Sequence, residues 1–155
     1  MPSYRRVVTG LNEAGQSCVL FDGPGGVASG SGARTILLWK SDQAPASNAG
    51  TADAADEPSS FEFARGGSKF VIVHFPPGTS EASGIGMHAS NTLDYGVVLS
   101  GRVTIVLEAG EADLGPGDLI IDRGVLHAWR NTGDEDCVVL WTIVDAEPIG
   151  AGATV

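Results

Sequence analysis

The sequence predicts an all-β fold, and three observations lead to it. Glycine accounts for 22 of the 155 residues, which is about twice the usual share of about 7%. Nowhere do apolar residues recur at i, i+3, i+4 and i+7 over a helix-length stretch without an interrupting glycine or proline. Short apolar runs follow one another instead, and from residue 69 onward they recur about every ten residues, the spacing of a sandwich or barrel.

Nine such runs are the expected strands, because each is rich in apolar residues and bounded by turn residues. They cover residues 5–9, 17–21, 34–40, 69–75, 94–99, 103–108, 119–121, 127–130 and 137–144. Residues 22–33 hold five glycines and are expected to form a mobile surface loop. Residues 41–60 contain no Val, Ile, Leu, Met, Cys or aromatic residue, so we expect a flexible segment that does not anchor in a core.

The charge balance and the hydropathy pattern exclude two classes of partner. Nine basic and nineteen acidic residues give a formal charge of −10, and the basic residues are scattered, whereas nucleic-acid binding rests on clustered Lys and Arg. No apolar run reaches the roughly 18 residues of a membrane span, and no secretion signal is recognisable. Cys18 and Cys137 lie far apart without a C-x-x-C pattern, as expected of buried, reduced thiols in a cytoplasmic protein.

Two motifs lie between residues 84 and 131. The first, GIGMHASNTLDYGVVLSG, offers His88, Ser90, Asp94 and Gly101, and the second, LGPGDLIIDRGVLHAWRN, offers Gly117, Asp118, His127 and Asn131. Their order and spacing resemble the two motifs of the cupin superfamily, with the short spacing of its small single-domain (cupin type-2) members. The resemblance covers residues 69–145.

The resemblance implies a small antiparallel β-barrel, or double-sheet jelly roll, formed by one domain over residues 1–155. Residues 69–145 would form the barrel core, and N-terminal strands within residues 1–40 would be joined to it by the flexible loop 41–60. In metal-binding cupins, two His and a Glu of the first motif and a His of the second hold one divalent ion. Carried over by position, the metal ligands here are His88, Asp94 and His127, for Fe, Mn, Zn or Ni, and no organic cofactor is expected.

Two positions depart from the family pattern. Ser90 stands where the family has its second His, and Asp94 is one methylene shorter than the family's Glu. Two imidazoles and one carboxylate still suit a divalent ion and leave positions open for substrate and water.

Strand alternation places the remaining pocket residues. Asp94, Gly96 and Val98 share one face of residues 94–99, so Gly96 is expected to leave space for a ligand beside the carboxylate. Trp129 shares a face with His127 and is expected to form an apolar wall beside the imidazole. With Ser90, these residues predict a small-molecule pocket inside the barrel.

The candidates also have structural interpretations. A buried Asp94 needs a cation or hydrogen-bond donors, and Arg102 and Arg130 are the nearest cations in the sequence. His74 precedes a turn and is expected to be a surface or core residue. An all-histidine site would need it, because the chain has only three histidines.

Three functions stay open. The first is a metal-dependent lyase, isomerase, decarboxylase or dioxygenase that acts on a small polar organic molecule, with His127 and Asp94 as catalytic residues. The second is a metal-free isomerase in which a His–Asp pair moves a proton. The third is a non-catalytic small-molecule-binding module. The resemblance also implies a homodimer, in which residues 5–9 and 34–40 add to a neighbour's sheet.

Overall fold

The computed structural model describes residues 4–30, 32–83 and 86–155, and this part of the chain forms strands and no helix. The all-β prediction is therefore confirmed. None of the described segments is a helix long and apolar enough to cross a membrane. The strands are β1 (Arg5–Leu11), β2 (Ser17–Pro24), β3 (Ala28–Ser29), β4 (Arg34–Ser41), β5 (Ser68–Phe75), β6 (Thr92–Ser100), β7 (Val103–Leu107), β8 (Gly110–Leu114), β9 (Leu119–Asp122), β10 (His127–Arg130) and β11 (Cys137–Asp145).

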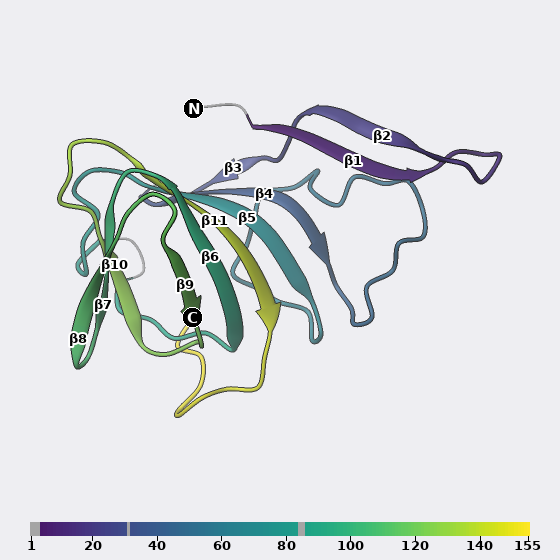
Figure 1. The fold of residues 1–155 in the computed structure, drawn as a ribbon. Coiled ribbons are helices and arrows are strands. Elements are labelled where there is room, and N and C mark those ends of the chain that lie inside the picture. Colours follow the sequence, from purple (N-terminus) through teal and green to yellow (C-terminus); the bar gives the residue numbers. More distant parts are fainter. Residues whose placement is uncertain (1–3, 31, 84–85) are drawn as a thin grey trace.

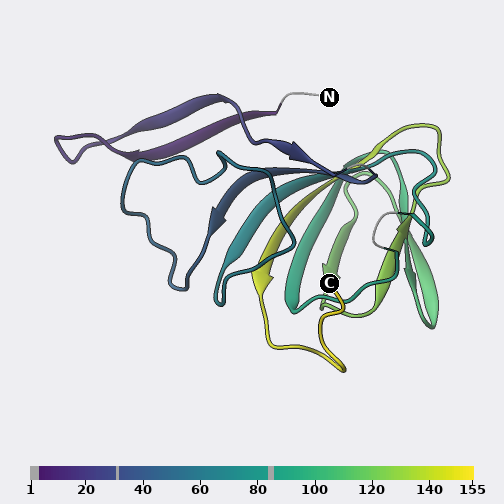
Figure 2. The same cartoon turned by 180° about the vertical axis from the view of Figure 1, so that it is seen from behind.

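Three antiparallel sheets make up the fold (Figure 1). The largest has the strand order β3-β4-β5-β11-β6-β9, and a three-stranded sheet has the order β10-β7-β8. These two sheets form the barrel, with β7, β8 and β10 at one end of the curved large sheet. The third sheet is the β1–β2 hairpin, which reaches away from the barrel at the other end (Figure 2).

The large sheet is buried on both faces over its central strands, because alternate side chains supply apolar groups to each side. The inner cluster fills the barrel and includes Leu37, Val71, Val98, Val139 and Trp141. The outer cluster is smaller and consists of Ile36, Leu38, Ile72 and Val138, with Tyr4 and Leu140 packed against it. The N-terminal segment therefore covers an apolar patch on the outside of the barrel.

The β1–β2 hairpin is tied to the barrel by a few polar contacts. Arg6 donates from Nη1 to the Leu38 carbonyl at 2.9 Å and pairs with the carboxylate of Asp53. The hairpin leaves the side chains of Val7, Leu11 and Val19 exposed. A two-stranded ribbon is marginally stable by itself, so these contacts at its base hold it in place.

Two loop predictions need correction. The segment 41–60 is anchored, because Ala55 is 2% exposed within the inner cluster and Asp53 binds Arg6. A small apolar side chain and a paired carboxylate supply this anchor, and a lack of large apolar residues does not exclude either. The predicted loop 22–33 contains the end of β2 and the short strand β3, while residue 31 lies outside the described ranges.

A second strand, besides β3, was not predicted. Residues 110–114 form β8, which pairs with β7. Four of its five residues are exposed, because it lies at the edge of the three-stranded sheet, and an exposed edge strand carries little of the apolar alternation on which strand prediction depends.

Candidate functional site

His88 and His127 are brought together by the backbone. The two residues form an isolated antiparallel bridge in which each N–H donates to the other's carbonyl at 2.9 Å. Their imidazole rings lie with centroids 4.3 Å apart. The first histidine of one motif and the histidine of the other therefore meet, as the sequence predicts. Residues 84 and 85 of the first motif lie outside the described ranges.

The hydrogen bonds fix which nitrogen of each ring carries the proton. Nδ1 of His88 lies 3.0 Å from the Gly86 carbonyl, and Nδ1 of His127 lies 2.9 Å from the Val125 carbonyl. A carbonyl only accepts, so both Nδ1 atoms are N–H donors and the lone pair of each neutral ring is on Nε2. Neither Nε2 makes a hydrogen bond within the described ranges. Burial lowers the pKa of His88, which favours its neutral form.

Asp122 completes a buried histidine–aspartate pair. Its Oδ2 lies 3.1 Å from Nδ1 of His127, and the two side chains are only 2% and 5% exposed. Its Oδ1 accepts the Gly124 N–H at 3.0 Å. The Val125 carbonyl holds the ring, and the carboxylate lies beside Nδ1, where its charge can stabilise an imidazolium formed when Nε2 takes up a proton.

Asp94 lies directly opposite Asp122 in the pairing of β6 with β9. Burial raises the pKa of Asp94 to about 6, the Asp122 carboxylate adds to the rise, and the Thr92 hydroxyl opposes it. Its Oδ1 is buried and has no hydrogen-bond partner in the described part of the chain.

The arginines considered as partners for Asp94 are engaged elsewhere. Arg130 binds Glu81 at 2.6 Å and Glu111 at 2.5 Å. The guanidinium of Arg102 lies against Gly115. The sequence alternative in which an arginine neutralises this carboxylate is therefore not realised.

The other predicted pocket residues have different surroundings. The Ser90 hydroxyl is hydrogen-bonded to the Thr92 hydroxyl at 2.7 Å, and Val98 is a fully buried member of the inner cluster. Trp129 meets the His127 ring edge-on, with centroids 5.7 Å apart, as expected of an apolar wall. Gly96 does not leave open space, because a Cβ there would lie 2.6 Å from the Trp141 ring. The glycine makes room for this tryptophan.

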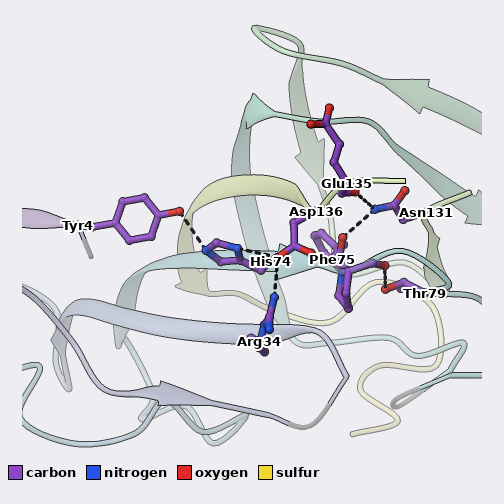
Figure 3. A network of polar contacts seen from close by, with 9 residues as sticks. Tyr4, Arg34, His74, Phe75, Thr79, Asn131, Glu135 and Asp136 are labelled. Atoms are coloured by element: carbon purple, nitrogen blue, oxygen red, sulfur yellow. Dashed lines mark hydrogen bonds and ion pairs between the residues drawn. The ribbon is translucent and has the colours of Figure 1, made fainter. Parts of the chain in front are cut away.

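His74 is a core residue on the other side of the sheet and takes no part in the site. The Tyr4 hydroxyl donates to its Nε2 at 2.9 Å, and Nδ1 faces Asp136 at 3.3 Å (Figure 3). Arg34 binds the same carboxylate at 2.5 Å. Both ring nitrogens are thus occupied by groups that join the N-terminal segment, β4 and the loop before β11.

The asparagine of the second motif also has a structural role. Asn131 donates from Nδ2 to the carbonyls of Phe75 and Glu135, at 2.8 and 2.9 Å (Figure 3). Its Oδ1 accepts the Gly133 N–H. The side chain therefore holds the loop between β10 and β11 against the end of β5.

The predicted metal ligands do not assemble as a set of three. No group of three or more His, Cys, Asp or Glu side chains that could hold a metal ion occurs among the residues that the structure describes. His88 and His127 offer two Nε2 atoms, but the Asp94 carboxylate lies opposite Asp122 and does not join them in such a group. The residues present therefore do not fit a three-ligand metal site.

Asp122 is the functional candidate that sequence reasoning missed. It ends the apolar strand of residues 119–121 and precedes Arg123-Gly124, five positions before His127. An acidic residue at the end of an apolar run and just before a motif histidine is a usable signal. This aspartate does not coincide with any ligand position of the family's motifs, so the resemblance does not point to it.

The barrel and its histidine pair at the meeting of two motifs define a cupin-type domain. Residues 71–143 match the family model Cupin_2, described as "Cupin domain". These residues therefore belong to the cupin superfamily. The cupin domain of Schizosaccharomyces pombe Cnp3 has the same fold, with a TM-score of 0.55 at 13% identity, and the alignment covers 93% of this chain and 89% of that one.

Curated relatives come from fungi. The "Cupin-domain-containing oxidoreductase srdD" of Neurospora crassa is 26% identical over 96% of this chain and 80% of that protein. The "Cupin-domain-containing oxidoreductase srdB" of the same organism is 38% identical over 50% of this chain and 39% of that protein. The "Phomopsin biosynthesis cluster protein D" of Diaporthe leptostromiformis is 43% identical over 44% of this chain and 35% of that protein. For the last two, the chain spans well under half of the relative's length.

Proposed function

We propose that this protein is an enzyme that moves a proton on a small organic molecule, with His127 as the base. The observation that carries the proposal is the buried contact between Nδ1 of His127 and the Asp122 carboxylate. Nε2 is then the basic atom of the ring. Because the contact is buried, dissolved salt screens it only weakly. The names of two relatives, which include the word oxidoreductase, support an enzymatic role in general.

The reaction class that fits is proton transfer at a carbon next to a carbonyl group. His127 takes the proton on Nε2, and Asp122 stabilises the resulting imidazolium. Asp94, whose pKa is raised to about 6, is the neighbouring group able to hold or give a proton on the same side of the sheet. Trp129 borders the imidazole and provides an apolar contact for the carbon skeleton of the substrate.

The proposal is tested by solvent deuterium exchange. A panel of small β-keto acids, hydroxyketones and 1,3-dicarbonyl compounds is incubated with the protein in D₂O, and loss of the α-proton signal is followed by NMR. We expect exchange with the natural chain and a loss of about 100-fold or more in His127→Gln. Asp122→Asn should also slow exchange. An exchange rate that the His127→Gln substitution leaves unchanged would contradict the proposal.

A metal-dependent reaction is the second candidate, and the histidine pair favours it. Both rings hold Nδ1 on a backbone carbonyl, which is the arrangement that presents Nε2 as a ligand. An ion of Fe, Mn, Zn or Ni would need a further donor that the described residues do not supply as a group. Elemental analysis of protein purified without chelator or nickel resin tests this candidate. Near-stoichiometric metal that is lost in His127→Ala would replace the acid–base proposal.

A further inference from the structure

The chain has only two lysines, Lys40 and Lys69, and the fold places them side by side. They are register partners in the pairing of β4 with β5. Both line one cavity of about 520 Å³ that lies between these strands and the segment 57–64. In an acidic chain, lysines are expected on the solvated surface. Their gathering at one cavity, away from the histidine pair, is the observation from which the inference starts.

Lys69 is almost fully buried, at 7% exposed. Its Nζ lies 2.7 Å from the Ser60 carbonyl and 2.5 Å from the Glu62 carbonyl, with the Ser60 hydroxyl more distant at 3.5 Å. The ring of Phe63 lies 4.3 Å from the nitrogen and excludes water on that side. Nζ is the donor in all three contacts, and no carboxylate is among the acceptors.

The groups around Lys69 shift its pKa in opposite directions. Burial lowers its pKa, and the neighbouring ammonium of Lys40 lowers it further, whereas Asp42, Glu57 and Glu62 act in the opposite direction. None of these three carboxylates forms an ion pair with Lys69 within the described ranges. A desolvated lysine next to another cation has the environment in which the neutral, nucleophilic amine forms near neutral pH.

Lys40 is held in its charged, protonated state. Its Nζ binds the Glu57 carboxylate and lies 3.4 Å from Asp42. The contact with Glu57 raises the pKa of Lys40, so this residue stays charged. One lysine therefore keeps its proton and lowers the proton affinity of the other.

We propose that this cavity is a second site, which takes a small aldehyde or ketone and in which Lys69 forms an imine with the carbonyl carbon. The Nζ lone pair forms the C–N bond, the carbonyl π electrons move to oxygen, and one nitrogen proton passes to that oxygen. The resulting hydroxyl leaves as water with the second nitrogen proton, and the C=N bond forms. The step needs no oxidant or reductant, and Lys40 is a positioning residue that acts through its charge.

The site is independent of the proton-transfer site, although both lie on the same sheet. Ile143 of β11 is the register partner of Lys69 on one side and of Asp94 on the other. Paired residues in a sheet point to the same face, so Lys69 and Asp94 share the inner face with one residue between them. The cavity does not include His88 or His127 in its lining.

The experiment traps the imine by reduction. The folded protein is incubated at pH 7 with benzaldehyde and sodium cyanoborohydride, and labelled amines are located by peptide mass spectrometry. With two lysines and one terminal amine, every product is assigned without ambiguity. We expect Lys69 to be labelled about tenfold faster than Lys40 or more, because the amine with the lower pKa has the larger neutral fraction at pH 7.

Two variants separate reactivity from a structural role. Lys40→Met should slow the labelling of Lys69 at pH 7 and move its pH profile to higher pH. Lys69→Arg keeps a cation on the two carbonyls and should abolish labelling at this position, with an unchanged melting temperature as the control for folding. Labelling of Lys69 at the rate of Lys40 or slower in the folded chain would overturn the proposal, because Lys69 would then only fasten the segment 57–64.

The readouts keep the two proposals apart. His127→Gln should leave the labelling of Lys69 unchanged, and Lys69→Arg should leave deuterium exchange unchanged. Each site can therefore fail its test without affecting the other.

Discussion

His127 and His74 are both almost completely buried, at 4% and 1% exposed, and in each an aspartate oxygen lies close to Nδ1, at 3.1 and 3.3 Å. They differ in the second ring nitrogen. Nε2 of His74 accepts the Tyr4 hydroxyl, whereas Nε2 of His127 makes no hydrogen bond within the described ranges. A histidine with both nitrogens occupied joins segments of the fold, and one with a single occupied nitrogen is able to exchange a proton.

The two aspartates differ in the same way. Asp136 is about one third exposed and is neutralised by Arg34, so its charge costs the fold little. Asp122 is buried, and its partners are an imidazole and the Gly124 N–H. The inner pair, His127 and Asp122, is thus a contact buried inside the barrel. The outer pair, His74 and Asp136, is a polar contact that joins segments on the other side of the sheet.

The largest expected effect of this difference is on activity. His127→Gln and His74→Gln replace each imidazole with a side chain of similar polarity. We expect His127→Gln to lower the rate of deuterium exchange by a factor of about 10² to 10⁴, because the base is lost. His74→Gln should leave the rate within about threefold, because it touches no substrate. Equal losses of exchange rate in both variants would show that the different surroundings of Nε2 in His127 and His74 have no bearing on catalysis.

The next effect concerns the buried carboxyl of Asp94, whose Oδ1 has no hydrogen-bond partner among the described residues. Its pKa is about 6 in the folded chain and about 3.9 in an unfolded one, so the folded state binds the proton more tightly. The stability that this proton contributes is complete below the unfolded pKa and is lost as the pH rises through about 6. Asp94→Asn should therefore flatten the pH dependence and gain up to about 3 kcal/mol near pH 8.

Urea unfolding of both chains at pH 4.5 and pH 8 measures this prediction. The informative quantity is the difference between the chains, because other acidic groups titrate equally in both. A difference that grows toward low pH would contradict the assigned direction of the shift.

The sequence predicted the fold and one part of the site, the histidine pair. The resemblance of the two motifs to the cupin family predicted that His88 and His127 would lie together, and a backbone bridge joins them. It did not predict that Asp122 would hold His127, since that contact depends on the register of β9 against β6. The role of Gly96 was wrong for a related reason. Alternation gives the face on which a residue lies, but only packing decides that Trp141 fills the space beside it.

A smaller effect tests the outer pair. Tyr4→Phe removes only the hydroxyl that donates to Nε2 of His74 and keeps the ring that packs on the outer cluster. We expect a loss of about 1 kcal/mol in the free energy of unfolding and no change in deuterium exchange. Thermal and urea unfolding measure the first quantity. A drop in exchange would mean that the N-terminal segment influences the inner site through the sheet.

The smallest effect is expected for Arg34→Ala. This substitution removes the cation from Asp136 but leaves His74 and Tyr4 in contact. Both partners of the ion pair are more than 30% exposed, and exposed pairs contribute about 0–1 kcal/mol. The loss should therefore be smaller than that of Tyr4→Phe and should shrink further in 0.5 M salt, as urea unfolding at two salt concentrations would show. A loss larger than that of Tyr4→Phe would mean that Arg34 organises the outer network, and His74 would then be the dependent member of that pair.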